Sequence, residues 1–145
     1  MCVPEVKKSK MTMNINCRLP NGLVRARTCY RHLAGELGIS IVSAMEKLGY
    51  LSAHMNHNGI EYILTKYGKE WSQKLEIGSL DRVQISACLD YSHHRPHLAG
   101  VWSVDFCAFL FYREYIARGD IERSVVVSPK GRSFFRDELA IEWVS

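Results

Sequence analysis

The chain has 145 residues, of which 47% are hydrophobic and 23% are charged, a composition typical of a folded globular protein. This composition excludes disorder over most of the chain, and no apolar run approaches the roughly 20 residues of a membrane span. The N-terminal segment has no apolar stretch of the secretory type, so the sequence predicts a soluble, cytoplasmic protein without membrane contact. The five cysteines form no CxxC pair, which argues against a disulfide framework.

The net charge of +4 is concentrated at the N-terminal end. Residues 1–31 contain seven bases and one acid, a net charge of +6, whereas residues 32–145 contain 12 bases and 14 acids, a net charge of −2. We expect residues 1–24 to form a flexible basic arm that is either solvated or in contact with phosphate. The candidate nucleic-acid contacts are Lys7, Lys8, Lys10, Arg18, Arg25 and Arg27.

One sequence module occurs twice. The tetrad His32-Leu33-Ala34-Gly35 recurs as His97-Leu98-Ala99-Gly100, at an offset of 65 residues. Each copy continues with an apolar segment, a polar turn, a short β-rich segment and a helix start at Thr65 or Ser128. Thr and Ser are favoured N-caps, so both copies predict a closing helix after the β-rich segment.

The repeat therefore predicts one order of elements for residues 25–79 and again for residues 80–145. A first helix ends at Cys29 or Cys88, a long helix follows the tetrad, and a β-hairpin and a closing helix complete each copy. The second copy has about six extra residues, 89–94, before its tetrad.

The hairpins are expected at about residues 52–64 and 117–127, where Asn-Gly and Arg-Gly-Asp sequences favour turns. The most apolar long helix contains Trp102, Phe106 and Leu110, which are expected in the core. The predicted fold class is α+β, a tandem duplication of a winged-helix-like unit. The two copies are expected to pack as one compact body.

The stretch Ala26 to Gly35, Ala-Arg-Thr-Cys-Tyr-x-His-Leu-Ala-Gly, resembles a motif in the C-terminal portion of bacterial ArsR-like winged-helix transcriptional regulators. Cys88 to Ser92 and His97 to Gly100 match the same portion, and the resemblance covers about residues 25–142. The family often has an acid where Arg31 stands and a tryptophan where Tyr91 stands. The resemblance implies an effector or dimerisation module that acts as a homodimer or with a partner regulator. The 24 residues before Arg25 are too few for the DNA-reading winged helix of that family, so we expect a stand-alone module, a truncated product or a fragment.

The most specific candidate site consists of two cysteines and two histidines. Cys29 and His32 are three residues apart, which would place both side chains on one face of the predicted helix, and the second copy supplies Cys88 and His97. Two thiolates and two imidazoles suit zinc, and several ArsR-like regulators are metal sensors. In the alternative interpretation the cysteines are small buried apolar residues, and the histidines bond the backbone or a carboxylate where the two repeats pack together. The sequence favours packing, because no CxxC or HxxxH pair strengthens the metal spacing, so we expect the four residues not to converge on one point.

Three functions remain open at this stage. The first is the effector or dimerisation module of a regulator, the second is a zinc-sensing domain, and the third is a small winged-helix protein that binds DNA by itself. DNA reading by the folded body is not favoured, because the stretch Ser40 to Ser43 that would face the bases contains no Arg, Lys, Asn or Gln. The sequence contains no nucleophile elbow, P-loop, dinucleotide fingerprint or paired-carboxylate motif, so catalysis is not predicted. No cofactor is expected, and zinc is the possible exception.

Overall fold

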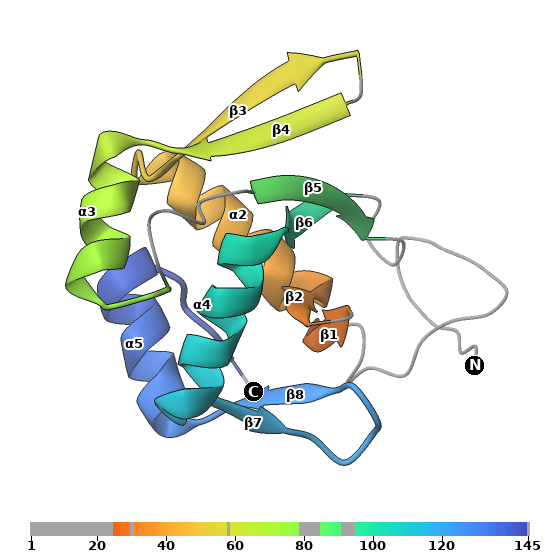
Figure 1. The fold of residues 1–145 in the computed structure, drawn as a ribbon. Helices are drawn as coiled ribbons and strands as arrows, with labels where there is room; N and C mark the ends of the chain where they lie inside the picture. Colours follow the sequence, from red (N-terminus) through yellow and green to blue (C-terminus); the bar gives the residue numbers. More distant parts are fainter. Residues whose placement is uncertain (1–24, 30, 58, 79–84, 91–94, 145) are drawn as a thin grey trace, which may run out of the picture.

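The computed structural model describes residues 25–29, 31–57, 59–78, 85–90 and 95–144. The first group of elements contains β1 (Arg27–Cys29), β2 (His32–Ala34), α2 (Gly35–Lys47), β3 (Leu51–Asn56), β4 (Gly59–Leu64) and α3 (Lys66–Lys74). The second group contains β5 (Ile85–Asp90), β6 (Arg95–Ala99), α4 (Val101–Tyr112), β7 (Ile116–Arg118), β8 (Val125–Val127) and α5 (Pro129–Leu139). Each group thus runs hairpin, helix, hairpin, helix, which fits the predicted α+β class (Figure 1).

All strand pairs in the described part of the chain are antiparallel, and one of them, β4 with β5, connects the two groups of elements. A four-stranded sheet has the order β3-β4-β5-β6, and its middle pair places Tyr62 of β4 opposite Ile85 of β5. Strand β1 lies beside the chain just before β8, where the Thr28 N–H donates to the Arg123 carbonyl at 2.9 Å. The two groups therefore share backbone pairing at two places and form one body. In Figure 1 the β3–β4 and β7–β8 hairpins lie at opposite ends of this body.

Helix α4 supplies the centre of the hydrophobic core and packs against β2 and β6. Trp102, Phe106 and Leu110 are buried, which confirms the core prediction. The Trp102 and Phe106 rings stack with their centroids 5.1 Å apart, and Trp71 of α3 meets Phe106 edge-on at 6.0 Å. None of the helices in the described part of the chain combines the length and the apolar character that a membrane span requires.

Both closing helices begin with the predicted N-cap. The Thr65 Oγ1 atom accepts a hydrogen bond from the Gly68 N–H at 3.1 Å at the start of α3. The Ser128 Oγ atom accepts the equivalent bond from the Gly131 N–H at 2.9 Å at the start of α5. A hydroxyl in this position satisfies one of the backbone donors that the first helical turn leaves unpaired.

The two His-Leu-Ala-Gly tetrads occupy equivalent strand-to-helix junctions. In each case the histidine, leucine and alanine belong to a strand, β2 or β6, and a helix starts at or just after the glycine. The glycine has a φ of 75° at Gly35 and 95° at Gly100. Residues with a Cβ rarely adopt such a conformation, which explains why glycine closes both tetrads.

The predicted helix before each tetrad is wrong. Cys29 lies in β1 and Cys88 lies in β5, so neither residue closes a helix, and each belongs to a strand that pairs with the strand of the following tetrad. The helix-helix-hairpin order of a winged helix is not found among the described residues. For Cys29 and His32 the reason is geometric, because residues i and i+3 share a helix face and can also pair directly opposite each other in an antiparallel hairpin. Of the extra residues of the second copy, 89 and 90 belong to β5, and 91–94 lie outside the described residues.

The other predicted hairpins are confirmed, with β3 and β4 spanning residues 51–64 and β7 and β8 spanning residues 116–127. The predicted basic arm, residues 1–24, lies outside the described residues, as does the predicted boundary at residues 79 and 80.

Candidate metal centre

Each of the two tetrad hairpins presents one thiol and one imidazole side by side. Cys29 is directly opposite His32 in the pairing of β1 with β2, and Cys88 is directly opposite His97 in the pairing of β5 with β6. Directly opposite residues in an antiparallel pair project from the same face, with their Cβ atoms about 4.5–5.5 Å apart. The cysteine and histidine of each hairpin therefore point in the same direction.

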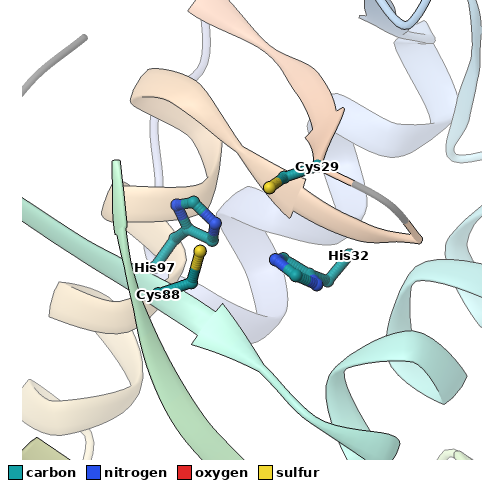
Figure 2. Close-up of side chains that lie close together, drawn as sticks. All are labelled: Cys29, His32, Cys88 and His97. Atoms are coloured by element: carbon teal, nitrogen blue, oxygen red, sulfur yellow. The ribbon is translucent and has the colours of Figure 1, made fainter. Parts of the chain in front are cut away.

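The two hairpins bring all four side chains together. The rings of His32 and His97 lie with their centroids 5.0 Å apart and their planes tilted by 40°. One ligand atom from each residue, the Sγ of Cys29 and Cys88 and a ring nitrogen of each histidine, lies within 4.8 Å of the other three. Figure 2 shows the four side chains surrounding one shared space. The prediction that these residues do not converge is therefore wrong.

The spacing of the ligand atoms is slightly wider than in a zinc site. Tetrahedral zinc with Zn–S bonds of about 2.3 Å and Zn–N bonds of about 2.0–2.1 Å holds its ligand atoms about 3.3–3.8 Å apart. The separations here, at most 4.8 Å, exceed those values by no more than about 1.5 Å. Rotation of the cysteine side chains between staggered positions covers movements of this size.

The histidines are buried, with 6% of His32 and 1% of His97 exposed, whereas the cysteines are half-buried. Burial, together with the neighbouring His97, lowers the pKa of His32 from 6.5 to about 4. His32 is therefore neutral at pH 7, and neutral imidazole is the form that binds metal ions.

The hydrogen bonding of His32 also fits a metal ligand. Its Nε2 atom is buried and has no hydrogen-bond partner within the part of the chain that the structure describes. An unsatisfied buried nitrogen costs about 1–3 kcal/mol, and a bond to a metal ion would remove this cost. The packing alternative had assigned a backbone or carboxylate partner to this histidine.

Gly38 determines how closely α2 approaches the four side chains of the candidate site, and it is not among the site residues predicted from the sequence. A Cβ at this position would lie 2.7 Å from the Leu33 carbonyl oxygen and 3.3 Å from the Cβ of His97. Only glycine allows α2 to contact the strand after His32 and the strand of His97 at once. The available signal was a glycine inside a predicted helix, which often marks close packing.

Two of the six predicted nucleic-acid contacts, Arg25 and Arg27, lie among the described residues. Arg27 is 2% exposed, so its guanidinium is not available to a phosphate in this structure. Arg25 forms an ion pair with Glu36 at 3.1 Å and lies over the ring of Trp143, 4.4 Å from its centroid. The other four candidates lie outside the described residues, namely Lys7, Lys8, Lys10 and Arg18.

The chain is similar to a curated protein described as the uncharacterized HTH-type transcriptional regulator YdfF of Bacillus subtilis (strain 168). The two are 26% identical over 122 residues, which cover 81% of this chain and 52% of the relative. The chain thus spans about half the length of that relative. No family model matches the chain, and no solved structure matches it. The similarity supports a relationship to transcriptional regulators.

Proposed function

We propose that this chain is the effector module of a transcriptional regulator and that its signal is a thiophilic divalent metal ion, with Zn²⁺ the best fit. The observation that carries the proposal is the convergence of Cys29, His32, Cys88 and His97 to within 4.8 Å. The regulatory role rests on the similarity to the HTH-type regulator from Bacillus subtilis. The resemblance of residues 25–142 to the C-terminal portion of ArsR-like regulators supports the same assignment.

The donor set favours zinc over the common hard cations. Magnesium and calcium prefer carboxylate, carbonyl and water oxygens, whereas sulfur and imidazole nitrogen suit zinc. Four protein ligands complete a tetrahedral zinc ion and leave no position for water or a substrate. The arrangement therefore fits a binding and sensing site better than a catalytic one.

The placement of the ligands suits a sensor because the ion would join two separate hairpins. One thiol and one imidazole come from β1 and β2, and the others come from β5 and β6. An ion that needs all four ligands binds only when the hairpins are held together, so its binding free energy stabilises that arrangement. Zinc would therefore bind more tightly when the two hairpins are together than when they are apart. This difference in affinity is what would shift the equilibrium between the two arrangements.

We also propose that the two halves arose by duplication, which would explain why the ligand pairs match. Tyr50 stacks on Trp71 in the first half with ring centroids 4.9 Å apart, and Tyr115 stacks on Phe134 in the second half at 4.4 Å. The N–H of each N-cap residue donates to the carbonyl of that tyrosine at 3.0 Å in both halves. Assembly of this chain as a homodimer or with a partner regulator stays a prediction.

Zinc titration of the metal-free protein, prepared without a polyhistidine tag, tests the proposal. We expect one zinc ion per chain, with affinity lowered at least about 100-fold in Cys29→Ser and in Cys88→Ser. Cys107→Ser is the matched control, because Cys107 is buried in α4 and is not one of the four ligands. Unchanged zinc affinity in both ligand variants would contradict the metal site and favour the packing role.

The regulatory half of the proposal needs a separate measurement in cells. In the parent strain, added zinc should change the transcript levels of the genes that the regulator controls. This response should be lost when the gene for this chain encodes Cys29→Ser. A strain carrying Cys107→Ser should behave like the parent. If the ligand variant responds to zinc as the parent does, the site has no signalling role.

A further inference from the structure

Two of the four ligands are thiols that lie close enough to react with each other. The Sγ atoms of Cys29 and Cys88 lie within 4.8 Å, and both residues are half-buried. They belong to different hairpins, so a bond between them would join β1 to β5. In Figure 2 both sulfur atoms point into the shared space between the hairpins.

We propose that Cys29 and Cys88 form an intramolecular disulfide in the metal-free protein on reaction with a hydroperoxide. The inference rests on the proposed function for its biological meaning, because the oxidised site would no longer offer thiolates to zinc. Zinc would then keep the sulfur atoms of Cys29 and Cys88 as thiolates, whereas the oxidant would join the same two atoms in a disulfide.

The geometry permits this bond. A disulfide places its sulfur atoms about 2.05 Å apart, so those of Cys29 and Cys88 must approach by no more than about 2.8 Å. Rotation about the Cα–Cβ bonds moves a cysteine sulfur over such distances.

The reaction has two steps and needs only hydrogen peroxide as oxidant. The thiolate sulfur of one cysteine attacks a peroxide oxygen, the O–O bond breaks, and a sulfenic acid and one water form. The sulfur of the second cysteine attacks the sulfenic sulfur, the S–S bond forms, and the hydroxyl group leaves as a second water. Two thiols and one hydrogen peroxide thus give one disulfide and two waters.

Zinc should protect the pair. A zinc-bound thiolate shares with the metal the electron pair that attacks peroxide, and the metal also occupies the space that the disulfide would cross. Cys107 offers an internal comparison in the same chain. It is buried, and burial raises its pKa to about 11, so it remains an inaccessible thiol at neutral pH.

The experiment treats the full chain, metal-free and zinc-loaded, with hydrogen peroxide and maps disulfides by mass spectrometry of non-reduced digests. Cys2 and Cys17 are replaced by Ser throughout, so that three cysteines remain. We expect the metal-free protein to lose two hydrogens in mass and to yield a peptide linking Cys29 to Cys88, with Cys107 unmodified. In the zinc-loaded protein we expect this reaction to slow at least about tenfold, with one zinc released per disulfide. Dithiothreitol should restore zinc binding.

The absence of a peptide that links Cys29 to Cys88 would overturn the inference, whether the two cysteines stay unmodified or are oxidised to sulfinic or sulfonic acid. A disulfide that involves Cys107 would overturn it as well. The zinc titration described above is read separately. Protein that binds zinc but forms no Cys29–Cys88 link would refute the disulfide alone, and protein that forms the link without binding zinc would refute the metal sensor alone.

Discussion

Cys29 and His32 are directly opposite each other across β1 and β2, and Cys88 and His97 have the same relationship across β5 and β6. Two residues separate the first pair in the sequence, whereas eight separate the second. Cross-strand register, and not sequence spacing, therefore makes the two pairs equivalent. A search for the regular ligand spacings of zinc motifs would overlook a site of this kind.

Zinc should raise the thermal stability of the protein. Binding only to the folded chain at a free zinc concentration 100 times the Kd adds about 2.7 kcal/mol, which corresponds to a Tm increase of about 5–10 °C for a chain of this size. Differential scanning fluorimetry with and without a chelator measures the shift. His32→Ala should have the same Tm under both conditions, and a chelator-sensitive Tm in that variant would contradict a ligand role for His32.

Local signals predicted much of the fold correctly. Thr65 and Ser128 were identified as N-caps from sequence alone, and both hairpins that follow the long helices were placed within about one residue. These features depend on hydrogen bonds between residues close in the chain. The burial of Phe106 could also be predicted from the sequence, because an apolar helix must be covered by the rest of the chain.

The candidate site could be identified by residue type but not by arrangement. The i, i+3 spacing of Cys29 and His32 fits a helix turn and a tight hairpin equally well, so the sequence led to the wrong element. Convergence of the two pairs depends on the approach of β2 to β6, and Gly38 of α2 packs against both strands. Contacts of this kind between distant segments have no local signature.

Acid should destabilise the metal-free protein through His32. Its pKa is about 4 in the folded chain and 6.5 as the ordinary value, so between these pH values the unfolded chain binds a proton at His32 that the folded chain does not. The free energy of unfolding therefore falls as the pH drops from about 7.5 towards 4, and this residue contributes little pH dependence above about 7.5. Urea unfolding at several pH values measures the effect.

Carboxylates also titrate in this window, so the control for the pH experiment is His32→Gln, which keeps a polar side chain without the titrating group. We expect a smaller loss of stability on acidification in the variant than in the parent. Identical pH profiles for the two proteins would show that His32 is not held neutral by burial.

Truncation of Phe106 should remove a central part of the core. The ring is 3% exposed and contacts Trp102 and Trp71, so Phe106→Ala should cost about 3–5 kcal/mol of unfolding free energy. Tyr112→Ala on the same helix is a matched control, because Tyr112 is 84% exposed and its loss should change stability by no more than about 0.5 kcal/mol. Urea denaturation compares the two, and a loss below about 1 kcal/mol for Phe106→Ala would place α4 outside the core.

Gly38→Ala separates two opposing physical effects. Helix propensity alone predicts that alanine stabilises the interior of α2 by about 1 kcal/mol relative to glycine. The new Cβ would instead lie 2.7 Å from the Leu33 carbonyl oxygen and 3.3 Å from the Cβ of His97, and overpacking of this kind costs about 1–3 kcal/mol. Because the carbonyl belongs to the backbone and cannot rotate away, we expect the contact to outweigh propensity and the variant to be destabilised.

The same substitution should also weaken zinc binding, by about tenfold or more, because α2 would push β2 away from β6 and separate His32 from His97. Ser40→Ala in the same helix is the control, since it changes helix propensity without adding volume next to the ligands. Urea unfolding and zinc titration of the two variants measure stability and affinity independently. If Gly38→Ala proved more stable than the parent and bound zinc equally well, the close approach of α2 would have no part in positioning the ligands.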